Sequence, residues 1–312
     1  MRSVSILRSV SGVSGWSARV ASASVALIAS VASVASVASV ASVASIALVA
    51  ASGCLQATPF GADPESRDLT AKNVAALAER PEPSGPFKIA ALGDTHDDYD
   101  RFAKAVELIN ARGDIDLVLH AGGMSDRGLL KELEWTTEIL GRLRMPFFAA
   151  IGNHDAISEG KAIYKTMFGP YDFSFAWGST KFVVFNSNTL EFPETAPNRD
   201  WITEALADRG DAKHLVVLTH QAPGAPDDIP GGTSTEVYKD LLATADIDVY
   251  IHGHVPEFSL LIPSGRTAVL SLGAFEEAPY YMVLTVDPER RDIAYERCDL
   301  ETCKDVVLVS AQ

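Results

Sequence analysis

Five short clusters of polar residues each follow an apolar run that has the length and composition of a buried strand. The clusters are Asp94-Thr95-His96, the segment 122–128, Gly152-Asn153-His154-Asp155, Thr219-His220 and His252-Gly253-His254. This order constrains the fold, because the strands must be buried and the polar residues must lie at their ends. Carboxylate, amide and imidazole side chains are ligands of divalent metal ions. The pattern therefore predicts that the fold gathers these side chains into one hydrolytic metal centre.

Hydrophobic periodicity predicts an α/β fold. We expect strands at 87–92, 117–119, 147–151, 173–177, 181–185, 214–218, 249–251, 268–272 and 280–286, and helices at 102–109 and 129–143. The alternation of strand and helix in the first half favours a parallel sheet, whose loops meet at the carboxyl ends of the strands. The second half is richer in strands. Two sheets packed face to face, with helices outside, would accommodate both halves.

Residues 1–53 differ in composition from the rest of the chain. They contain Arg2, Arg8 and Arg19 but no acidic residue, and a repeating Ala-Ser-Val tract fills 20–46. A positively charged start followed by a long apolar stretch is typical of a signal segment or a membrane anchor. Small residues precede Cys54, which resembles the cleavage site of a bacterial lipoprotein. After cleavage, Cys54 would be the first residue of the mature protein and would carry the lipid. The alternative is an uncleaved transmembrane helix. In both cases we expect an exported protein tethered to a membrane of the cell envelope.

The remaining chain is expected to contain a linker and one domain. Residues 54–86 are rich in Pro, Ala and charged residues and indicate a linker, with one short helix near 69–79. Residues 87–312 are within the size that a single hydrophobic core supports. No internal repeat other than the Ala-Ser-Val tract is visible in the sequence.

The charge of the chain bears on its partners. It has 26 basic and 41 acidic residues, and three of the basic residues lie in 1–53. An acidic surface repels the phosphates of nucleic acid over a Debye length. We therefore expect no nucleic acid partner.

Two cysteines follow Cys54 in the chain. In an exported protein, Cys298 and Cys303 would form a small disulfide loop. The alternatives are a metal-binding pair and two free thiols.

The first and third clusters have spacings that suit metal binding. Asp94 and His96 are two residues apart, so a turn can direct both at one ion, although a solvated turn has the same composition. Gly152 lets the chain turn out of its strand, Asn153 offers a neutral oxygen ligand, and His154 lies beside it, where it would meet a substrate.

Two histidines, His220 and His254, each follow a strand end further along the chain. A lone histidine there is more often a hydrogen-bonded core or surface group than a ligand. Two of them, in this order after the earlier clusters, favour metal ligation. Neutral imidazoles suit Mn, Fe or Zn.

These motifs resemble those of the calcineurin-like metallophosphoesterases over nearly all of residues 87–287. The resemblance implies a four-layer α/β/β/α sandwich of two mixed sheets flanked by helices. It also implies that Asp94 and His96 hold one metal and that the other is held by Asn153, His220 and His254. His154 matches the histidine thought to protonate the leaving group. Asp126 matches its acidic partner, and Arg127 matches a phosphate-binding arginine of part of the family.

Two positions depart from the family pattern. The aspartate that bridges both metals corresponds to Gly123, and the last histidine of the family corresponds to Pro256. Both losses affect the first metal, so we expect one tightly bound ion and a second that is weak or absent. The substitutions Gly123→Asp and Pro256→His together are expected to raise the metal occupancy toward two and to increase turnover, provided that the loops relax. Nearby groups that could replace the missing ligands are Asp97, Asp98, Ser125, His252 and Glu257.

These features predict metal-dependent hydrolysis of a phosphomonoester or phosphodiester. The alternative is a degenerate member of the family that acts as a ligand-binding or structural lipoprotein of the envelope.

Overall fold

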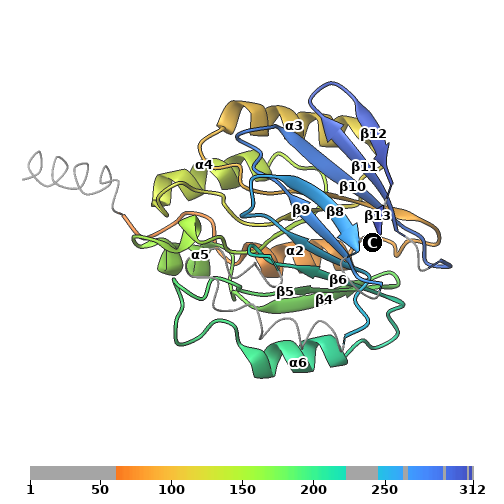
Figure 1. Cartoon of the computed structure of the whole chain (residues 1–312). Coiled ribbons are helices and arrows are strands. Elements are labelled where there is room, and N and C mark those ends of the chain that lie inside the picture. The colour runs from red at the N-terminus through yellow and green to blue at the C-terminus, as the bar shows by residue number, and fades with distance from the viewer. Residues whose placement is uncertain (1–60, 223–244, 263–265, 291–292, 308, 311–312) are drawn as a thin grey trace, which may run out of the picture. The chain divides into compact units, whose positions relative to one another are not determined.

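The structure of the chain is a computed structural model that describes residues 61–222, 245–262, 266–290, 293–307 and 309–310 (Figure 1). All of these residues belong to one compact unit, 59–312. The Ala-Ser-Val tract and Cys54 lie outside the described residues. None of the helices in the described part of the chain is long and apolar enough to cross a membrane.

Two mixed sheets form the centre of this unit. The first sheet has the strand order β12-β11-β10-β1-β2-β3 and the second has the order β13-β8-β9-β7-β6-β5-β4. The strands of the first sheet are β1 (Phe87–Leu92), β2 (Leu117–His120), β3 (Phe147–Ala149), β10 (Tyr280–Val286), β11 (Ile293–Asp299) and β12 (Cys303–Val306). Those of the second are β4 (Phe173–Trp177), β5 (Thr180–Val184), β6 (His214–Leu218), β7 (Val249–His252), β8 (Phe258–Ile262), β9 (Ala268–Leu272) and β13 (Val309–Ser310).

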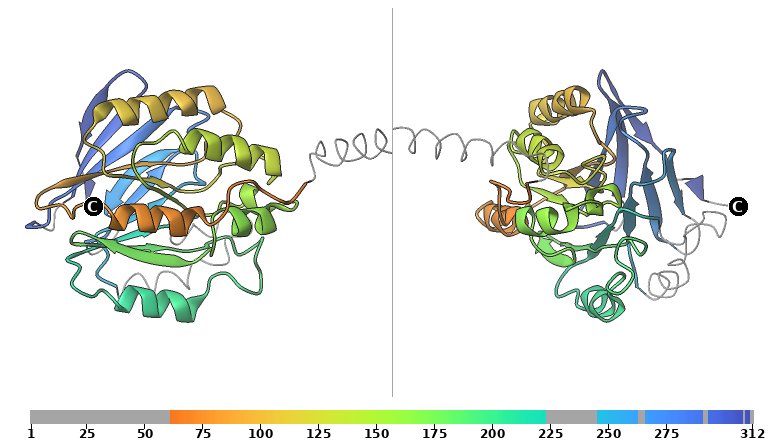
Figure 2. Two further views of the ribbon diagram at one scale, coloured as in Figure 1. Left: turned by 180° about the vertical axis from the view of Figure 1, so that it is seen from behind. Right: turned by 90° about the vertical axis from the view of Figure 1, so that its left-hand side faces the viewer.

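Helices cover the outer faces of both sheets (Figure 2). Helices α3 (Tyr99–Arg112), α4 (Leu130–Leu140) and α5 (Gly160–Met167) share a hydrophobic cluster with one face of the first sheet. Helix α6 (Arg199–Ala207) packs in the same way on the second sheet. The predicted four-layer α/β/β/α sandwich is therefore confirmed.

Alternation along the strands produces these layers, because successive side chains of a strand point to opposite faces. Ile89 and Ala91 of β1 face the second sheet in the central core, whereas Ala90 and Leu92 face the helices. All four are buried. Continuous apolar runs such as 87–92 are expected for strands that are covered on both faces.

The direction of the strands brings the polar clusters to one end of the sandwich. Strands β1, β2 and β3 are parallel to one another, and so are β5, β6, β7 and β9. The loops after β1, β2 and β3 therefore leave the first sheet at the same edge, and those after β6 and β7 leave the second sheet in the same way.

Several element boundaries differ from those predicted. Helix α3 is longer than the range 102–109 and ends at Gly113, whose φ of 71° is left-handed, a conformation that glycine adopts without strain. The prediction missed β8, β11, β12 and β13. In β11 the buried Ile293 and Tyr295 alternate with the more exposed Ala294 and Glu296, and the mixed composition hides the strand.

The expected linker needs a correction in its second half. Helix α2 (Leu69–Ala78) forms near the predicted position, but Leu77 is buried in the central core. The backbone N–H of Thr70 donates to the Phe168 carbonyl (3.0 Å), and the N–H of Phe147 donates to Asn73 Oδ1 (3.3 Å). The folded domain therefore begins upstream of the expected boundary at Phe87, and α2 is part of it.

Candidate metal centre

The loops of the two sheets meet through hydrogen bonds that involve the predicted ligands. Within the first sheet, the N–H of Asp94 donates to the Gly122 carbonyl (2.8 Å). Between the sheets, the N–H of His254 donates to Asp94 Oδ2 (2.9 Å), and His220 Nδ1 donates to the Ala121 carbonyl (2.8 Å). The structure thus brings together clusters that are far apart in the sequence.

Three predicted ligands have left-handed backbone conformations. The φ angles are 51° for Asp94, 40° for His96 and 65° for His254. Residues other than glycine rarely adopt positive φ, and such conformations concentrate at functional sites, where the surrounding structure enforces them. Here the hydrogen bonds between the loops hold these turns.

Asn153 and His220 form the best-defined pair of the site. Asn153 Oδ1 lies 2.8 Å from His220 Nε2. The other ring nitrogen of His220 donates to Ala121, so a neutral His220 has a lone pair on Nε2. The amide oxygen is also an acceptor. Two acceptors this close are stabilised by a cation that both can bind.

His254 completes this group. Its ring centroid lies 5.1 Å from that of His220. Burial, and then the neighbouring His220, lowers the pKa of His254 to about 4. A neutral imidazole is the form that binds metal. Asn153, His220 and His254 therefore fit one divalent cation with open coordination positions.

Asp94 and His96, predicted for the first metal, lie close together but lack two partners. Asp94 Oδ1 is 3.7 Å from His96 Nε2. Burial opposes the charge of His96, but Asp94 outweighs it and raises the pKa of His96 to about 9. Asp94 stays ionised, because His220 and His96 overcome the effect of its burial and keep its pKa below the usual range. Two protein ligands are fewer than a divalent metal usually has.

The space of the missing bridging side chain is already filled. A Cβ atom on Gly123 would lie 2.6 Å from Asp94 Oδ1 and 2.9 Å from Asp94 Cα. Gly123 also has a φ of 67°. The expectation that Gly123→Asp and Pro256→His raise the metal occupancy toward two stays a prediction, and it requires the loop that carries Asp94 to move away from position 123.

The groups considered as replacement ligands are engaged elsewhere or exposed. Ser125 Oγ donates to Asp155 Oδ1 (2.8 Å), and His252 Nδ1 donates to the Gly253 carbonyl (2.8 Å). Asp98 forms an ion pair with Arg101 (2.6 Å). Asp97 and Glu257 are exposed.

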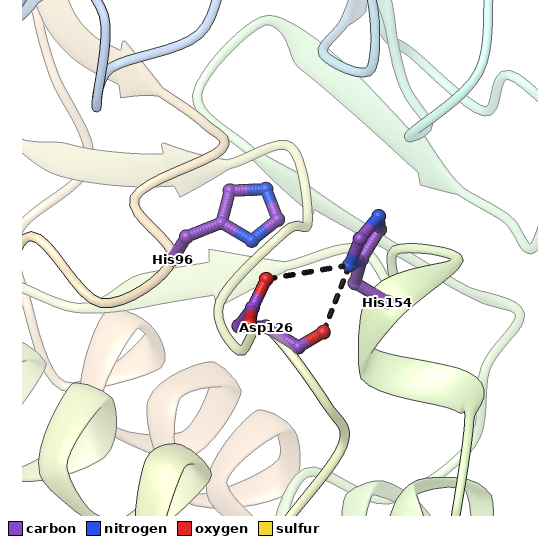
Figure 3. Close-up of side chains that lie close together, drawn as sticks. All are labelled: His96, Asp126 and His154. Carbon is purple, nitrogen blue, oxygen red and sulfur yellow. Dashed lines mark hydrogen bonds and ion pairs between the residues drawn. The ribbon is translucent and has the colours of Figure 1, made fainter.

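Two of the three predicted catalytic residues, Asp126 and His154, lie close to each other and to His96 (Figure 3). His154 Nδ1 donates to the backbone carbonyl of Asp126 (2.9 Å) and lies 3.8 Å from its carboxylate. Arg127 Nη2 is 3.2 Å from Asp126 Oδ2, and 70% of the Arg127 side chain is exposed. His154 is also exposed, at 45% of its side chain. His154 and Arg127 can therefore reach a bound molecule.

Asp155 is a supporting residue to which the sequence reasoning gave no role. Its fully buried carboxylate accepts hydrogen bonds from the backbone N–H groups of Gly123, Met124, Ser125 and Gly152, at 2.8 to 3.0 Å, and from the Ser125 hydroxyl. It therefore fixes the loop after β2 to the loop after β3. An acidic residue directly after Asn153-His154 is the only sequence signal for it.

Two further buried side chains hold the loops. His120 accepts a hydrogen bond from the N–H of Gly122 at Nδ1 (3.2 Å), and its Nε2 donates to Thr95 Oγ1 (3.2 Å). Ser187 Oγ accepts from the N–H groups of His220 (3.3 Å) and Gln221 (2.8 Å). In the sequence, His120 stands at the end of an apolar run and Ser187 in the polar segment 186–189, and neither belongs to one of the five clusters.

Comparison with known proteins identifies a family. A sequence model described as calcineurin-like phosphoesterase matches residues 87–258, which contain all the site residues above. No curated protein sequence matches the chain.

Solved structures with the same fold include two phosphatases and one anchor protein. A purple acid phosphatase from yellow lupin (Lupinus luteus) seeds has 14% identity and a TM-score of 0.57, and the match covers 74% of this chain and 55% of that one. A dimetal phosphatase from Danio rerio has 12% identity and a TM-score of 0.57, with 70% and 98% covered. An anchor protein of the inner membrane complex of Plasmodium has 14% identity and a TM-score of 0.55, with 72% and 89% covered.

Proposed function

The chain belongs to the calcineurin-like phosphoesterase family, and we propose that it hydrolyses a phosphomonoester or phosphodiester with one divalent metal ion held by Asn153, His220 and His254. The observation that supports this proposal is the contact of 2.8 Å between Asn153 Oδ1 and His220 Nε2, two atoms that can both bind one cation. The family depends on metal ions. In this chain the ion would be Mn, Fe or Zn, because imidazole ligands suit these metals.

A cation at this position would polarise a phosphoryl oxygen and lower the pKa of a water molecule. The remaining chemistry falls to the side chains. His154 is held at Nδ1 by the Asp126 carbonyl, so Nε2 is the atom that can transfer a proton to the oxygen of the leaving group. The Asp126 carboxylate lies 3.8 Å from the same ring nitrogen and helps to orient the ring.

Arg127 would bind the phosphate group. Its guanidinium is anchored by Asp126 yet mostly exposed, and guanidinium groups bind phosphate oxygens through two parallel hydrogen bonds. The acidic character of the chain as a whole makes such a local cation important for an anionic substrate.

A second candidate function is binding of a phosphorylated ligand with little turnover. The filled space at Gly123 favours it, because no residue there can bridge two metal ions. The same fold also occurs in a protein described as an anchor.

An assay of the purified full chain separates these functions. The metal-stripped protein is supplied with Mn²⁺, Fe²⁺ or Zn²⁺ and tested on p-nitrophenyl phosphate and its diester. We expect metal-dependent release of nitrophenol, which His220→Ala abolishes. The matched control is His214→Ala, a buried histidine at the opposite end of β6 whose Nε2 contacts the Asp287 carbonyl (2.9 Å). Metal binding without turnover would favour the ligand-binding function, and equal loss in both variants would contradict the assigned role of His220.

We also infer that the domain is tethered to a membrane through residues 1–53 or through a lipid on Cys54. The support is compositional: a basic start, a long apolar tract, and small residues before the cysteine. Cys298 and Cys303, which form a disulfide, agree with an oxidising compartment.

A further inference from the structure

We propose that His96, Asp126 and His154 form a second cation site that inhibits the protein when it is filled. One potential ligand atom from each of these residues lies within 4.8 Å of the other two. The residues come from the loops after β1, β2 and β3, which the first sheet brings to one edge, and Figure 3 shows them facing one another. Two imidazoles and one carboxylate are a common ligand set for Fe²⁺ and related divalent metals with open positions.

His96 supplies a nitrogen that has no other partner. Its Nε2 faces Asp94 Oδ1 at 3.7 Å, while its Nδ1 is buried and makes no hydrogen bond within the described residues. A ring nitrogen of His96 points toward Asp126 and His154 (Figure 3). A buried polar atom without a partner destabilises a protein, and a bound cation would satisfy it.

The other two ligands can adjust to an ion. A cation with bonds of about 2.1 Å holds its ligand atoms at most about 4.2 Å apart, so the cluster must contract slightly. His154 and Asp126 are the exposed members, with 45% and 35% of their side chains accessible, and they can rotate. His96 is buried and fixed between them and Asp94.

This cluster differs from the first metal position implied by the family. That position would combine Asp94 and His96 with side chains at 123 and 256, and here these are a glycine without space and an exposed proline. The geometry instead combines His96 with the pair assigned to proton transfer. The retained ion at Asn153, His220 and His254 shares no ligand with it.

Inhibition is expected because the ion would bind the ring of His154, the residue assigned to proton transfer. Binding at His154 Nδ1 displaces the proton that now goes to the Asp126 carbonyl, and this proton is released to solvent. The ion would then hold His154 in place of the hydrogen bond to the Asp126 carbonyl, so the ring assigned to proton transfer would no longer be positioned for that step. This inhibitory effect rests on the proposed function, whereas the cation site itself does not.

The test is a titration of the metal-stripped full chain with Co²⁺, followed by calorimetry and by the visible spectrum of the bound ion. We expect two binding events, a tighter one at the retained ligands and a weaker one at the new site. Asp126→Asn keeps the shape of the side chain but removes the charge, and we expect it to weaken only the second event. The loss should reach at least the roughly 10- to 100-fold that removal of an outer-sphere partner causes.

Controls separate the possible outcomes. His220→Ala should remove the tighter event and leave the weaker one, and Asp100→Asn, an exposed acid near His96, should change neither. The tighter event in Asp126→Asn also proves that the variant is folded. A single event in the wild-type chain, or a second event that Asp126→Asn leaves unchanged, overturns the site.

An activity measurement tests the inhibitory effect separately. Hydrolysis of an aryl phosphate should rise with the first equivalent of Co²⁺ and fall with the second. Two binding events without hydrolysis at any ratio contradict the proposed function but not the cation site. Two events with hydrolysis that keeps rising contradict the inhibition.

Discussion

The carboxylate of Asp94 lies where a side chain at Gly123 would begin, 2.6 Å from the position of a Cβ atom. The Asp94 carboxylate thus lies against the backbone of the next loop, and the N–H of Asp94 donates to the Gly122 carbonyl of that loop (2.8 Å). A single substitution at position 123 cannot reverse this arrangement.

Gly123→Ala should destabilise the domain more than a glycine substitution with the same backbone angle but free space. The control is Gly113→Ala, with a φ of 71° and no atom within 4 Å of the added Cβ. The positive φ alone should lower the free energy of unfolding by about 1 kcal/mol in the control. The contact with Asp94 should add about 1 to 3 kcal/mol at position 123. Urea unfolding of both variants measures the difference, and equal losses would show that the turn has room.

Asp155→Asn should weaken the site without removing a ligand. The amide keeps one acceptor oxygen, and its NH₂ group would face N–H groups that now donate to the carboxylate. We expect a loss of about 3 kcal/mol in the free energy of unfolding and weaker metal binding. Asp97→Asn, an exposed acid nearby, should change stability by less than about 0.5 kcal/mol. If Asp155→Asn is as stable as the wild-type protein, the Asp155 carboxylate does not hold the two loops together.

Leu77→Ala tests whether helix α2 belongs to the domain. The Leu77 side chain is 2% exposed and packs in the central core, so the cavity should lower the free energy of unfolding by about 2 to 4 kcal/mol. Val74→Ala in the same helix is the control, because Val74 is 38% exposed. Should thermal unfolding of the two variants coincide, α2 would have to be assigned to the linker after all.

The disulfide bond between Cys298 and Cys303 confirms the predicted loop. Arg112 Nη1 lies 3.5 Å from Cys298 Sγ and 3.4 Å from Cys303 Sγ. Trypsin should release 298–304 as one peptide, lighter by two hydrogens and resistant to alkylation before reduction. The double variant Cys298→Ser/Cys303→Ser should lose about 2 kcal/mol of stability, the loop-closure value for so short a loop. Two alkylated cysteines in the non-reduced peptide would contradict the bond.

Cys54→Ser tests the membrane tether. If Cys54 carries a lipid, the variant lacks acylation and leaves the membrane fraction, while the wild-type protein remains there. Mass spectrometry of the mature amino terminus and fractionation of cells give the result. A variant that still partitions entirely into membranes indicates an uncleaved helix instead.

The sequence was most informative where one local signal decides the structure. Strands β6 and β10 have the predicted ends because each is a mostly apolar run that stops before a polar residue, Thr219 after β6 and Asp287 after β10. Strand β12 was missed, since Cys303-Lys304-Asp305-Val306 carries no apolar pattern and pairs with β11 only at the edge of the sheet.

The site could be predicted in residue types but not in contacts. Asn153 and His220 were expected as ligands from their positions after strands, and the structure places them 2.8 Å apart. Their metal ligation remains a prediction. His96 lies close to Asp126, and the space at Gly123 is filled. Both features depend on how two loops from different strands pack against each other. The sequence of either loop alone does not predict this packing.

The retained ligands come from both halves of the sandwich, since Asn153 follows β3 of the first sheet while His220 and His254 follow β6 and β7 of the second. Between the sheets, Phe148 of β3 stacks on Phe175 of β4, with ring centroids 3.9 Å apart. A substitution there touches no ligand, yet any sliding of one sheet against the other would pull Asn153 away from the two histidines. If the proposed ion binds these three residues, its affinity would report on the alignment of the two sheets, so a substitution deep in the core would be detected at the strand ends.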